Sequence, residues 1–303
     1  MKKCAVVINP NSGKGKYIVN EIKDKLKEYG YENEVYLTKY PLHAEEIVAN
    51  LPDVDLVISL GGDGTFSEVM NGNLKRKKPL LLSHIPVGTT NDVGHMYGLS
   101  NDIIDNLECI LNGKKKKVDV CTINERCLVY VASFGKFMDI PYETPQELKK
   151  RIGHMAYILA GAKQVFRRTP KYNITYEIDG VKHHGKYTFL IISNANRIAG
   201  INNFYHDMKL DDEKFEVMFC SISNLAKLAH AFYILKTSDI SFINGVECYK
   251  TDNLKITFND GCKKPWCLDG EKFDAKTAHY EIETTKKIEM LLPKKNIDKL
   301  FIK

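Results

Sequence analysis

Short runs of apolar residues recur through the first third of the chain, and each run is followed by a glycine-containing loop and a helical pattern. Runs without polar alternation are typical of strands buried on both faces of a parallel sheet. The predicted buried strands are Cys4–Ile8, Val54–Leu60 and Pro79–Ile85, Tyr31–Thr38 alternates as a further strand, and helical spacing follows at residues 18–30, 43–51, 65–70 and 103–111. These units predict a doubly wound, mostly parallel α/β sheet whose ligand crevice lies at the carboxyl ends of its strands.

The remainder of the chain shows mainly strand patterns. Asp179-Gly180 is a hairpin signal, and two helices are expected, Pro145–Phe166 and Asn224–Leu235. The predicted strands are Val118–Ile123, Cys127–Phe134, Lys186–Ser193, Phe215–Ile222, Leu254–Phe258, Tyr280–Glu283 and Ile288–Leu292. We therefore expect a first domain over residues 1–122, a β-rich, sandwich-like domain over residues 123–286, and a return of residues 287–303 to the first domain.

Composition indicates a globular, cytoplasmic protein. Of 303 residues, 44% are hydrophobic and 27% are charged, and no run approaches the ~18 apolar residues of a membrane span. The eight cysteines form no C-x-x-C pair, so we expect reduced thiols, and neither zinc nor disulfides. The net charge of +6 includes clusters at residues 75–78, 114–117 and 149–151, which are typical either of solvated loops or of contact with an anionic membrane surface. No recognisable nucleic-acid module is present.

The stretch Ser59–Gly72, reading SLGGDGTFSEVMNG, carries the first candidate chemistry. Gly61 and Gly62 let a ligand approach the backbone, and Asp63 follows at the carboxyl end of a buried strand. Thr65 and Glu68 have the spacing of a capping box at the start of a helix. Amides and the helix dipole at such a turn favour an anion, which predicts a nucleotide phosphate site. An ordinary strand-to-helix turn is the alternative.

Three further segments add polar groups to this picture. The loops NPNSGKGK (residues 9–16) and PVGTTND (86–92) each follow a predicted buried strand, and LDGE (268–271) lies in the β-rich region. The Asx pair Asn91 and Asp92 either caps the next helix or faces a ligand. LDGE is either a D-G turn between strands or a pair of carboxylates for proton transfer. Trp266, close by, is expected in the core.

These four motifs, in this order, resemble the diacylglycerol kinase catalytic family, and within it the soluble bacterial diacylglycerol kinase and lipid kinase branch. The resemblance extends over nearly the whole chain, whereas GGDG alone is shared with NAD kinases. It implies a two-domain enzyme, with a fold like that of NAD kinases and diacylglycerol kinases, that uses ATP to phosphorylate a lipid in an interdomain cleft. The residues it implies around ATP are Asn9, Pro10, Asn11, Ser12, Gly13, Thr38, Gly61, Gly62, Asp63, Gly64, Thr65, Phe66, Ser67 and Thr89. Either Asp269 or Glu271 is implied as the catalytic base.

The resemblance also implies Mg²⁺. Asp63, Asp92 and Asp119 match acidic positions of a magnesium and water network. A structural Mg²⁺ is implied in the second domain, held by the side chain of Asp212 and by the carbonyl groups of Lys209 and Lys214. The usual glycine of that segment is Glu213 here, which adopts a positive φ less readily.

The leading hypothesis is a kinase that moves the γ-phosphate of Mg-ATP to diacylglycerol, giving phosphatidic acid for phospholipid metabolism. Its expected partners are ATP and a lipid at a membrane surface that the enzyme touches peripherally; a homodimer is expected from the resemblance alone. The alternatives are a kinase of another lipid alcohol, such as a sphingoid base or a prenol, an NAD kinase, and a non-catalytic nucleotide-binding regulator.

Overall fold

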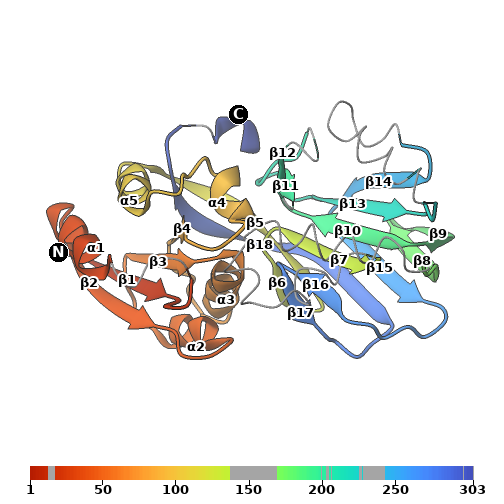
Figure 1. Ribbon diagram of the computed structural model, residues 1–303, viewed down its shortest axis with the longest axis horizontal. Coiled ribbons are helices and arrows are strands. Elements are labelled where there is room, and N and C mark those ends of the chain that lie inside the picture. The colour runs from red at the N-terminus through yellow and green to blue at the C-terminus, as the bar shows by residue number, and fades with distance from the viewer. Residues whose placement is uncertain are drawn as a thin grey trace. The chain divides into compact units, whose positions relative to one another are not determined.

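The computed structural model of the chain describes residues 1–12, 18–136, 169–198, 200–202, 205, 207–224, 227, 243–295 and 297–302. The chain forms two compact units, Met1–Val120 with Lys286–Lys303, and Cys121–Thr285 (Figure 1). The expected helices Pro145–Phe166 and Asn224–Leu235 fall almost entirely outside the described residues. None of the described helices combines the length and the apolar content needed to cross a bilayer.

The first unit is built on four parallel strands in the order β2-β1-β3-β4. These are β1 (Lys2–Ile8), β2 (Tyr31–Leu37), β3 (Leu56–Gly61) and β4 (Leu82–Pro86). Every residue of β3 is buried, as expected of a strand covered on both faces. Helices α2 (His43–Asn50) and α3 (Asp63–Leu74) pack together, α4 (Asp92–Met96) contacts α3, and α1 (Val19–Glu28) contacts α5 (Ile103–Leu111). The predicted parallel α/β architecture is confirmed.

The second unit contains two antiparallel sheets. One has the order β14-β13-β10-β7-β16-β17, and the other pairs β18, β15, β8 and β9. The strands of the first sheet are β7 (Val131–Gly135), β10 (Phe189–Ser193), β13 (Phe215–Cys220), β14 (Val246–Thr251), β16 (Trp266–Leu268) and β17 (Glu271–Phe273). Those of the second are β8 (Tyr172–Ile178), β9 (Val181–Tyr187), β15 (Asn253–Phe258) and β18 (His279–Leu292). The D-G hairpin between β8 and β9 is confirmed, and β14, β16 and β17 were not predicted.

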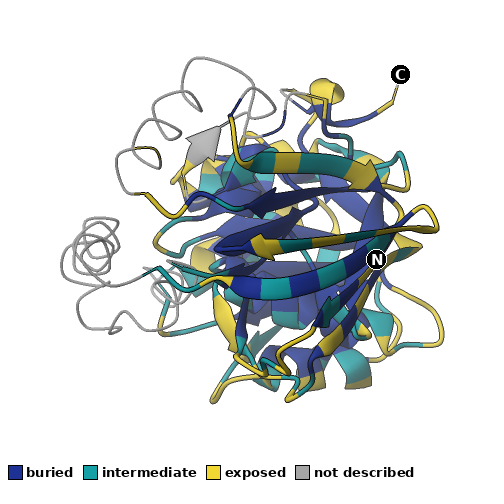
Figure 2. Cartoon of the chain, turned by 90° about the vertical axis from the view of Figure 1, so that its right-hand side faces the viewer, coloured by how far each residue is buried: buried dark blue, intermediate teal, exposed yellow. Residues whose placement is uncertain are grey.

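Aromatic side chains from both sheets fill the core of the second unit. The ring of Phe134 lies 4.5 Å from that of Phe258, and Tyr176 stacks on Phe219 at 4.0 Å. Trp266 is fully buried in the same cluster, so its predicted place in the core is confirmed. Buried residues follow the strands in Figure 2. The aromatic contacts explain how this unit holds two sheets face to face.

Two predicted strands are each broken in the structure. Cys127–Phe134 is divided into β6 (Arg126–Leu128) and β7, because backbone amides at the break bond to a distant carboxylate. Lys186–Ser193 is divided at Thr188, where the chain leaves one sheet and joins the other. The Thr188 hydroxyl donates to the carbonyl oxygens of Cys220 (2.9 Å) and Ile222 (3.0 Å), which fixes this corner. Neither break has a glycine or proline to signal it.

Two other strands are longer than predicted. Tyr280–Glu283 and Ile288–Leu292 are parts of the single strand β18, which pairs antiparallel with β15 and, at Met290, parallel with β4. The strand β5 (Lys114–Ile123) includes the lysine run that the sequence places before it. Partners hold these lysines in strand geometry: Lys114 lies 2.6 Å from Asp298, and Lys116 lies over the ring of Phe301.

The predicted capping box at Thr65 and Glu68 is wrong. Helix α3 begins at Asp63, three residues earlier than a capping Thr65 requires, and Gly62 is its N-cap. The Glu68 carboxylate instead accepts hydrogen bonds from the amides of Leu42 (2.8 Å) and Ala44 (3.1 Å). Glu68 therefore caps the first turn of the neighbouring helix α2, whose own N-cap residue, Leu42, has no side-chain oxygen.

Substitution of Glu68 by alanine is expected to destabilise the chain by about 1–2 kcal/mol, since two amides at the start of α2 lose their acceptor. A urea unfolding curve with a lower midpoint and an unchanged slope would show this. Glu32→Ala, at an exposed position of β2, is the matched control and should change the midpoint little. An equal shift in both variants would contradict the capping role.

Candidate active site

The loops that follow β1, β2, β3 and β4 are joined at the carboxyl edge of the parallel sheet. Three hydrogen bonds connect them: Thr38 N to Ile8 O (2.9 Å), Val87 N to Gly61 O (2.8 Å) and Asn9 Nδ2 to Thr65 Oγ1 (3.2 Å). The Asn9 side chain also accepts from the Asn11 amide (3.0 Å), which shapes the turn after β1. The structure thus brings four separate segments of the predicted ATP site to one edge of the first unit.

Gly88 lets the loops after β3 and β4 touch, and Gly61 leaves room for Thr65 in the first turn of α3. A Cβ atom added to Gly88 would lie 2.7 Å from the Cα of Gly62, and one added to Gly61 would lie 2.5 Å from the Cβ of Thr65. Both distances are too short for any side chain, so packing alone requires glycine here. Thr89, in the second of these loops, is exposed, and Gly64 is half-buried.

Asp63 connects the glycine loop to the next helix. Its side chain accepts hydrogen bonds from the amides of Asp92 (3.0 Å) and Val93 (3.1 Å), the first two residues of α4. The residue is only 8% exposed. Asp63 therefore positions α4, a contact for which the sequence contains no signal. Asn91 does not cap α4 with its side chain: it accepts from the Gly88 amide at 2.7 Å and closes its own loop.

Two of the predicted ATP residues point into the interior. Phe66 is 1% exposed and stacks on His84 at 4.7 Å. Ser67 is also buried. Burial lowers the pKa of His84 to about 3, so this imidazole is neutral at physiological pH. Phe66 of α3 and His84 of β4 thus pack helix against sheet in the interior of the first unit. Gly13 lies outside the described residues, as do Lys14 and Lys16.

Asp119 is held by a lysine that sequence reasoning missed. The Nζ atom of Lys287 lies 3.6 Å from Asp119 Oδ1, and the Asp119 side chain is fully buried. Burying a carboxylate without a partner is costly, so the lysine offsets the charge. The two residues are far apart in the sequence, and only the pairing of β18 in the first unit brings them together.

In the second unit, LDGE forms the tight turn between β16 and β17. Asp269 and Gly270 have φ values of 50° and 85°, as in the turns that join two-residue hairpins. The two Asp269 oxygens accept hydrogen bonds from three successive amides, of Val129 (3.0 Å), Tyr130 (3.0 Å) and Val131 (3.2 Å). Asp269 is 2% exposed, whereas Glu271 is exposed. The two carboxylates of this motif thus lie in different environments.

The segment predicted to hold a structural Mg²⁺ is also in the second unit. Glu213 adopts a φ of 63°, so the chain makes the expected turn without glycine. The Lys214 amide donates to Asp212 Oδ1 at 3.1 Å. The other Asp212 oxygen forms an ion pair with Lys250 at 2.6 Å, a contact that the sequence did not predict.

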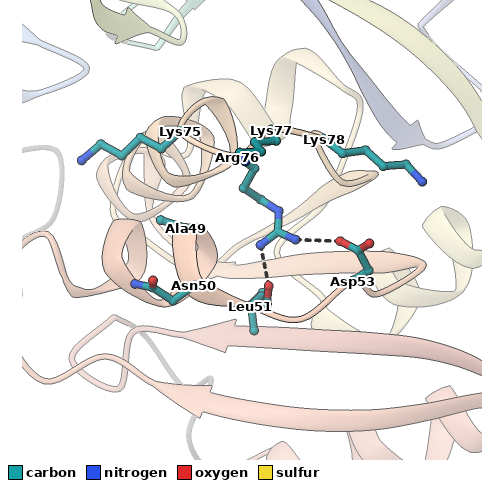
Figure 3. Close-up of a pocket in the computed structure, with 8 residues that line it drawn as sticks. All are labelled: Ala49, Asn50, Leu51, Asp53, Lys75, Arg76, Lys77 and Lys78. Carbon is teal, nitrogen blue, oxygen red and sulfur yellow. Dashed lines mark hydrogen bonds and ion pairs between the residues drawn. The ribbon is translucent and has the colours of Figure 1, made fainter.

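The basic cluster at residues 75–78 is partly structural. Arg76 donates to the carbonyl oxygens of Val48 (3.1 Å) and Leu51 (2.6 Å) and to Asp53, and Lys75 pairs with Glu45 at 2.6 Å. A surface hollow of about 430 Å³ lies beside them. In Figure 3, Arg76 points to Leu51 and Asp53, while Lys75 and Lys78 point in opposite directions. These cations do not converge on one point. The cluster at residues 149–151 lies outside the described residues.

Comparison with known proteins agrees with this geometry. Residues 3–123 match the diacylglycerol kinase catalytic domain. The chain is 34% identical to a diacylglycerol kinase of Staphylococcus aureus strain RF122 over 236 residues, which cover 76% of this chain and 74% of the relative; the strain MRSA252 enzyme matches equally.

The fold is that of solved kinase structures. A diacylglycerol kinase from Bacillus anthracis strain Sterne superposes with a TM-score of 0.76 at 23% identity, covering 96% of this chain and 97% of that one. A second B. anthracis structure gives a TM-score of 0.77 at 20% identity, with the same coverage. These likenesses show the fold, and the S. aureus relatives show the family. The chain therefore belongs to the diacylglycerol kinase family and is a lipid kinase.

Proposed function

We propose that the chain transfers the γ-phosphate of Mg-ATP to the primary hydroxyl of diacylglycerol, giving phosphatidic acid. The membership in the family supports phosphate transfer to a lipid, and the name of the S. aureus relatives favours diacylglycerol among lipid alcohols. One observation carries the assignment of roles: LDGE holds one carboxylate buried on three amides and leaves the other exposed.

The first unit supplies the nucleotide site in this proposal. Its Asn9, Thr38, Gly61 and Thr65 lie at the edge where parallel strands end, the usual ligand position in such sheets. The loop residues Pro10, Asn11, Ser12, Gly62, Gly64 and Thr89 complete the proposed contacts. Phosphoryl transfer needs mainly positioning and neutralisation of charge, which backbone donors at this edge provide.

The magnesium ion is proposed to arrive with ATP. The described residues contain no group of three or more His, Cys, Asp or Glu side chains placed to hold a metal ion, and Mg²⁺ is commonly bound by one or two carboxylates together with substrate phosphates. Asp63 and Asp92 would supply those carboxylates, directly or through water, and Asp119, whose carboxylate is paired with Lys287, would take part only through water. When bound, the ion neutralises charge that develops on the phosphates.

Glu271 is the proposed base. It accepts the proton of the lipid hydroxyl while that oxygen forms a bond to the γ-phosphorus, and the bond from phosphorus to the bridging oxygen breaks to release ADP. Asp269 is a positioning residue, because its oxygens are already engaged by three amides that stabilise its ionised form. Glu271 follows directly on the turn that Asp269 fixes.

Phosphate transfer from labelled ATP in mixed micelles tests this function. Diacylglycerol, sphingosine and a prenol are offered as acceptors, NAD serves as the soluble control, and the Glu271→Gln variant serves as the background. Label in phosphatidic acid alone is the expected result. Label in another lipid would replace the substrate but keep the kinase, and label in NAD would contradict a lipid substrate.

Two proposals about partners can be tested, the first with the same assay and the second by light scattering. If the enzyme acts at a membrane surface, its rate should rise with the mole fraction of diacylglycerol in the micelle at constant bulk concentration. Basic residues at the surface, such as Lys77 and Lys78, would favour anionic micelles. A homodimer, the second proposal, predicts a mass near twice the 34.5 kDa of one chain by light scattering.

A further inference from the structure

A lysine ammonium lies among oxygen atoms where the loop before β13 meets β14. Lys250 Nζ is 2.6 Å from Asp212 Oδ2 and 3.6 Å from Glu216 Oε1. It also donates to the carbonyl oxygen of Asp207 at 3.0 Å. Two carboxylates and one carbonyl therefore surround a single positive charge.

Strand pairing and a tight turn hold the carboxylates of Glu216 and Asp212 next to the Lys250 ammonium. Glu216 and Lys250 are directly opposite each other in the β13–β14 pair. Asp212 uses its second oxygen to accept from the Lys214 amide, and the positive φ of Glu213 completes that turn. The Asp212 and Glu216 side chains are only 13% and 7% exposed. A buried carboxylate is costly to ionise unless a cation lies close by, and Lys250 is that cation here.

A divalent ion does not fit beside this ammonium. Of the three residues implied to bind Mg²⁺, Asp212 alone has a side-chain carboxylate, and both of its oxygen atoms already have partners. An ion on Asp212 would bring a double positive charge next to the Lys250 ammonium at short range, and such charges repel. The set Lys209, Asp212 and Lys214 is therefore poorly suited to the structural Mg²⁺ that the family resemblance implies.

We propose that the Lys250 ammonium is the structural cation of the second unit and replaces that divalent ion. It ties residues 207–216 to β14 in the way a metal would, through a carbonyl and two carboxylates. Within the part of the chain that the structure describes, the buried Glu216 Oε2 atom has no hydrogen-bond partner, so the carboxylate of Glu216 depends on Lys250 for compensation. Folding of this unit should then be independent of divalent ions.

Thermal unfolding of the full chain without nucleotide or lipid tests the proposal. The wild-type melting temperature should be the same in EDTA and in magnesium chloride. Lys250→Met should lower it by roughly 5–10 °C in EDTA, since removal of one partner leaves buried charge uncompensated. Magnesium should restore much of that loss, because the vacated space among Asp207, Asp212 and Glu216 then suits a cation.

Two further variants make the result specific. Lys255→Met removes a lysine that also pairs across strands of the same unit, with Glu281 at 3.5 Å, but both side chains are 57% exposed. This control should change the melting temperature little. Lys250→Arg keeps the cation and should remain close to wild type in EDTA, so a test is available even if Lys250→Met does not fold.

Binding of Mn²⁺, followed by electron paramagnetic resonance, measures the site directly. Lys250→Met should bind one ion more than wild type, and the double variant with Asp212→Asn should lose it. The proposal would be overturned by a wild-type Mn²⁺ site that Asp212→Asn removes, or by wild-type unfolding that EDTA promotes. Neither measurement requires catalysis, so failure here is distinguishable from failure of the proposed kinase function.

Discussion

Replacing Glu271 by glutamine is expected to lower kcat for lipid phosphorylation by about 10²–10⁴-fold, the usual contribution of a positioned general base. The amide keeps the size of the side chain and cannot take up the hydroxyl proton. Because Glu271 is exposed, its loss should leave the melting temperature unchanged. Steady-state kinetics in mixed micelles, with ATP affinity measured separately, would show a fall in kcat at constant nucleotide binding.

Glu281→Gln is the matched control for this variant. Glu281 is an exposed carboxylate on β18 of the same unit and forms only a surface ion pair with Lys255. It should retain wild-type kcat. A Glu271→Gln enzyme that keeps more than about a tenth of the wild-type rate would refute the role of Glu271 as general base.

Asp269→Asn is expected to affect folding and activity together. An asparagine oxygen can still accept from some of the amides of Val129, Tyr130 and Val131, but its NH₂ group faces donors and leaves at least one of them unsatisfied. Hydrogen bonds to charged groups contribute about 1.5–3 kcal/mol each, so we expect a melting temperature lower by roughly 5–10 °C. The rate should also fall, because the turn that carries Glu271 loosens.

Calorimetry and kinetics on the same preparations separate the two carboxylates. Asp269→Asn should be less stable than wild type, whereas Glu271→Gln should be as stable but far less active. Asp260→Asn, at an exposed turn of the same unit, controls for the loss of a carboxylate. A stable but inactive Asp269→Asn would instead make Asp269 the base.

The sequence predicted those parts of the fold that depend on local patterns. Buried strands such as β3 are apolar at nearly every position. The Asp-Gly pair after β8 is typical of a two-residue hairpin turn, in which both residues have a positive φ. The predicted strand boundaries are less accurate where a strand is interrupted by a hydrogen bond to a residue far away in the sequence. Nothing near Val129 in the sequence reveals that its amide donates to Asp269, because the two residues are 140 positions apart.

In the candidate site, too, local motifs could be predicted from the sequence, whereas contacts between distant residues could not. The glycines and carboxylates of the motifs are visible in the sequence, but their partners are not. Asp63 positions the start of α4, Glu68 caps α2, and Asp119 is compensated by Lys287. Each contact joins a side chain to a residue that sheet pairing or helix packing brings near. The spacing of residues along the sequence does not predict such pairs.

The first unit is made of two segments that the ribosome synthesises at different times, because the whole second unit lies between them in the sequence. Residues 286–303 belong to this unit, and Ser83 of β4 donates to the Leu291 carbonyl at 2.8 Å. The edge of β4 therefore stays unpaired while the whole of Cys121–Thr285 is translated, roughly ten to thirty seconds at about 5–20 residues per second. During that interval the nascent N-terminal segment exposes an apolar strand edge, the kind of surface that chaperones shield.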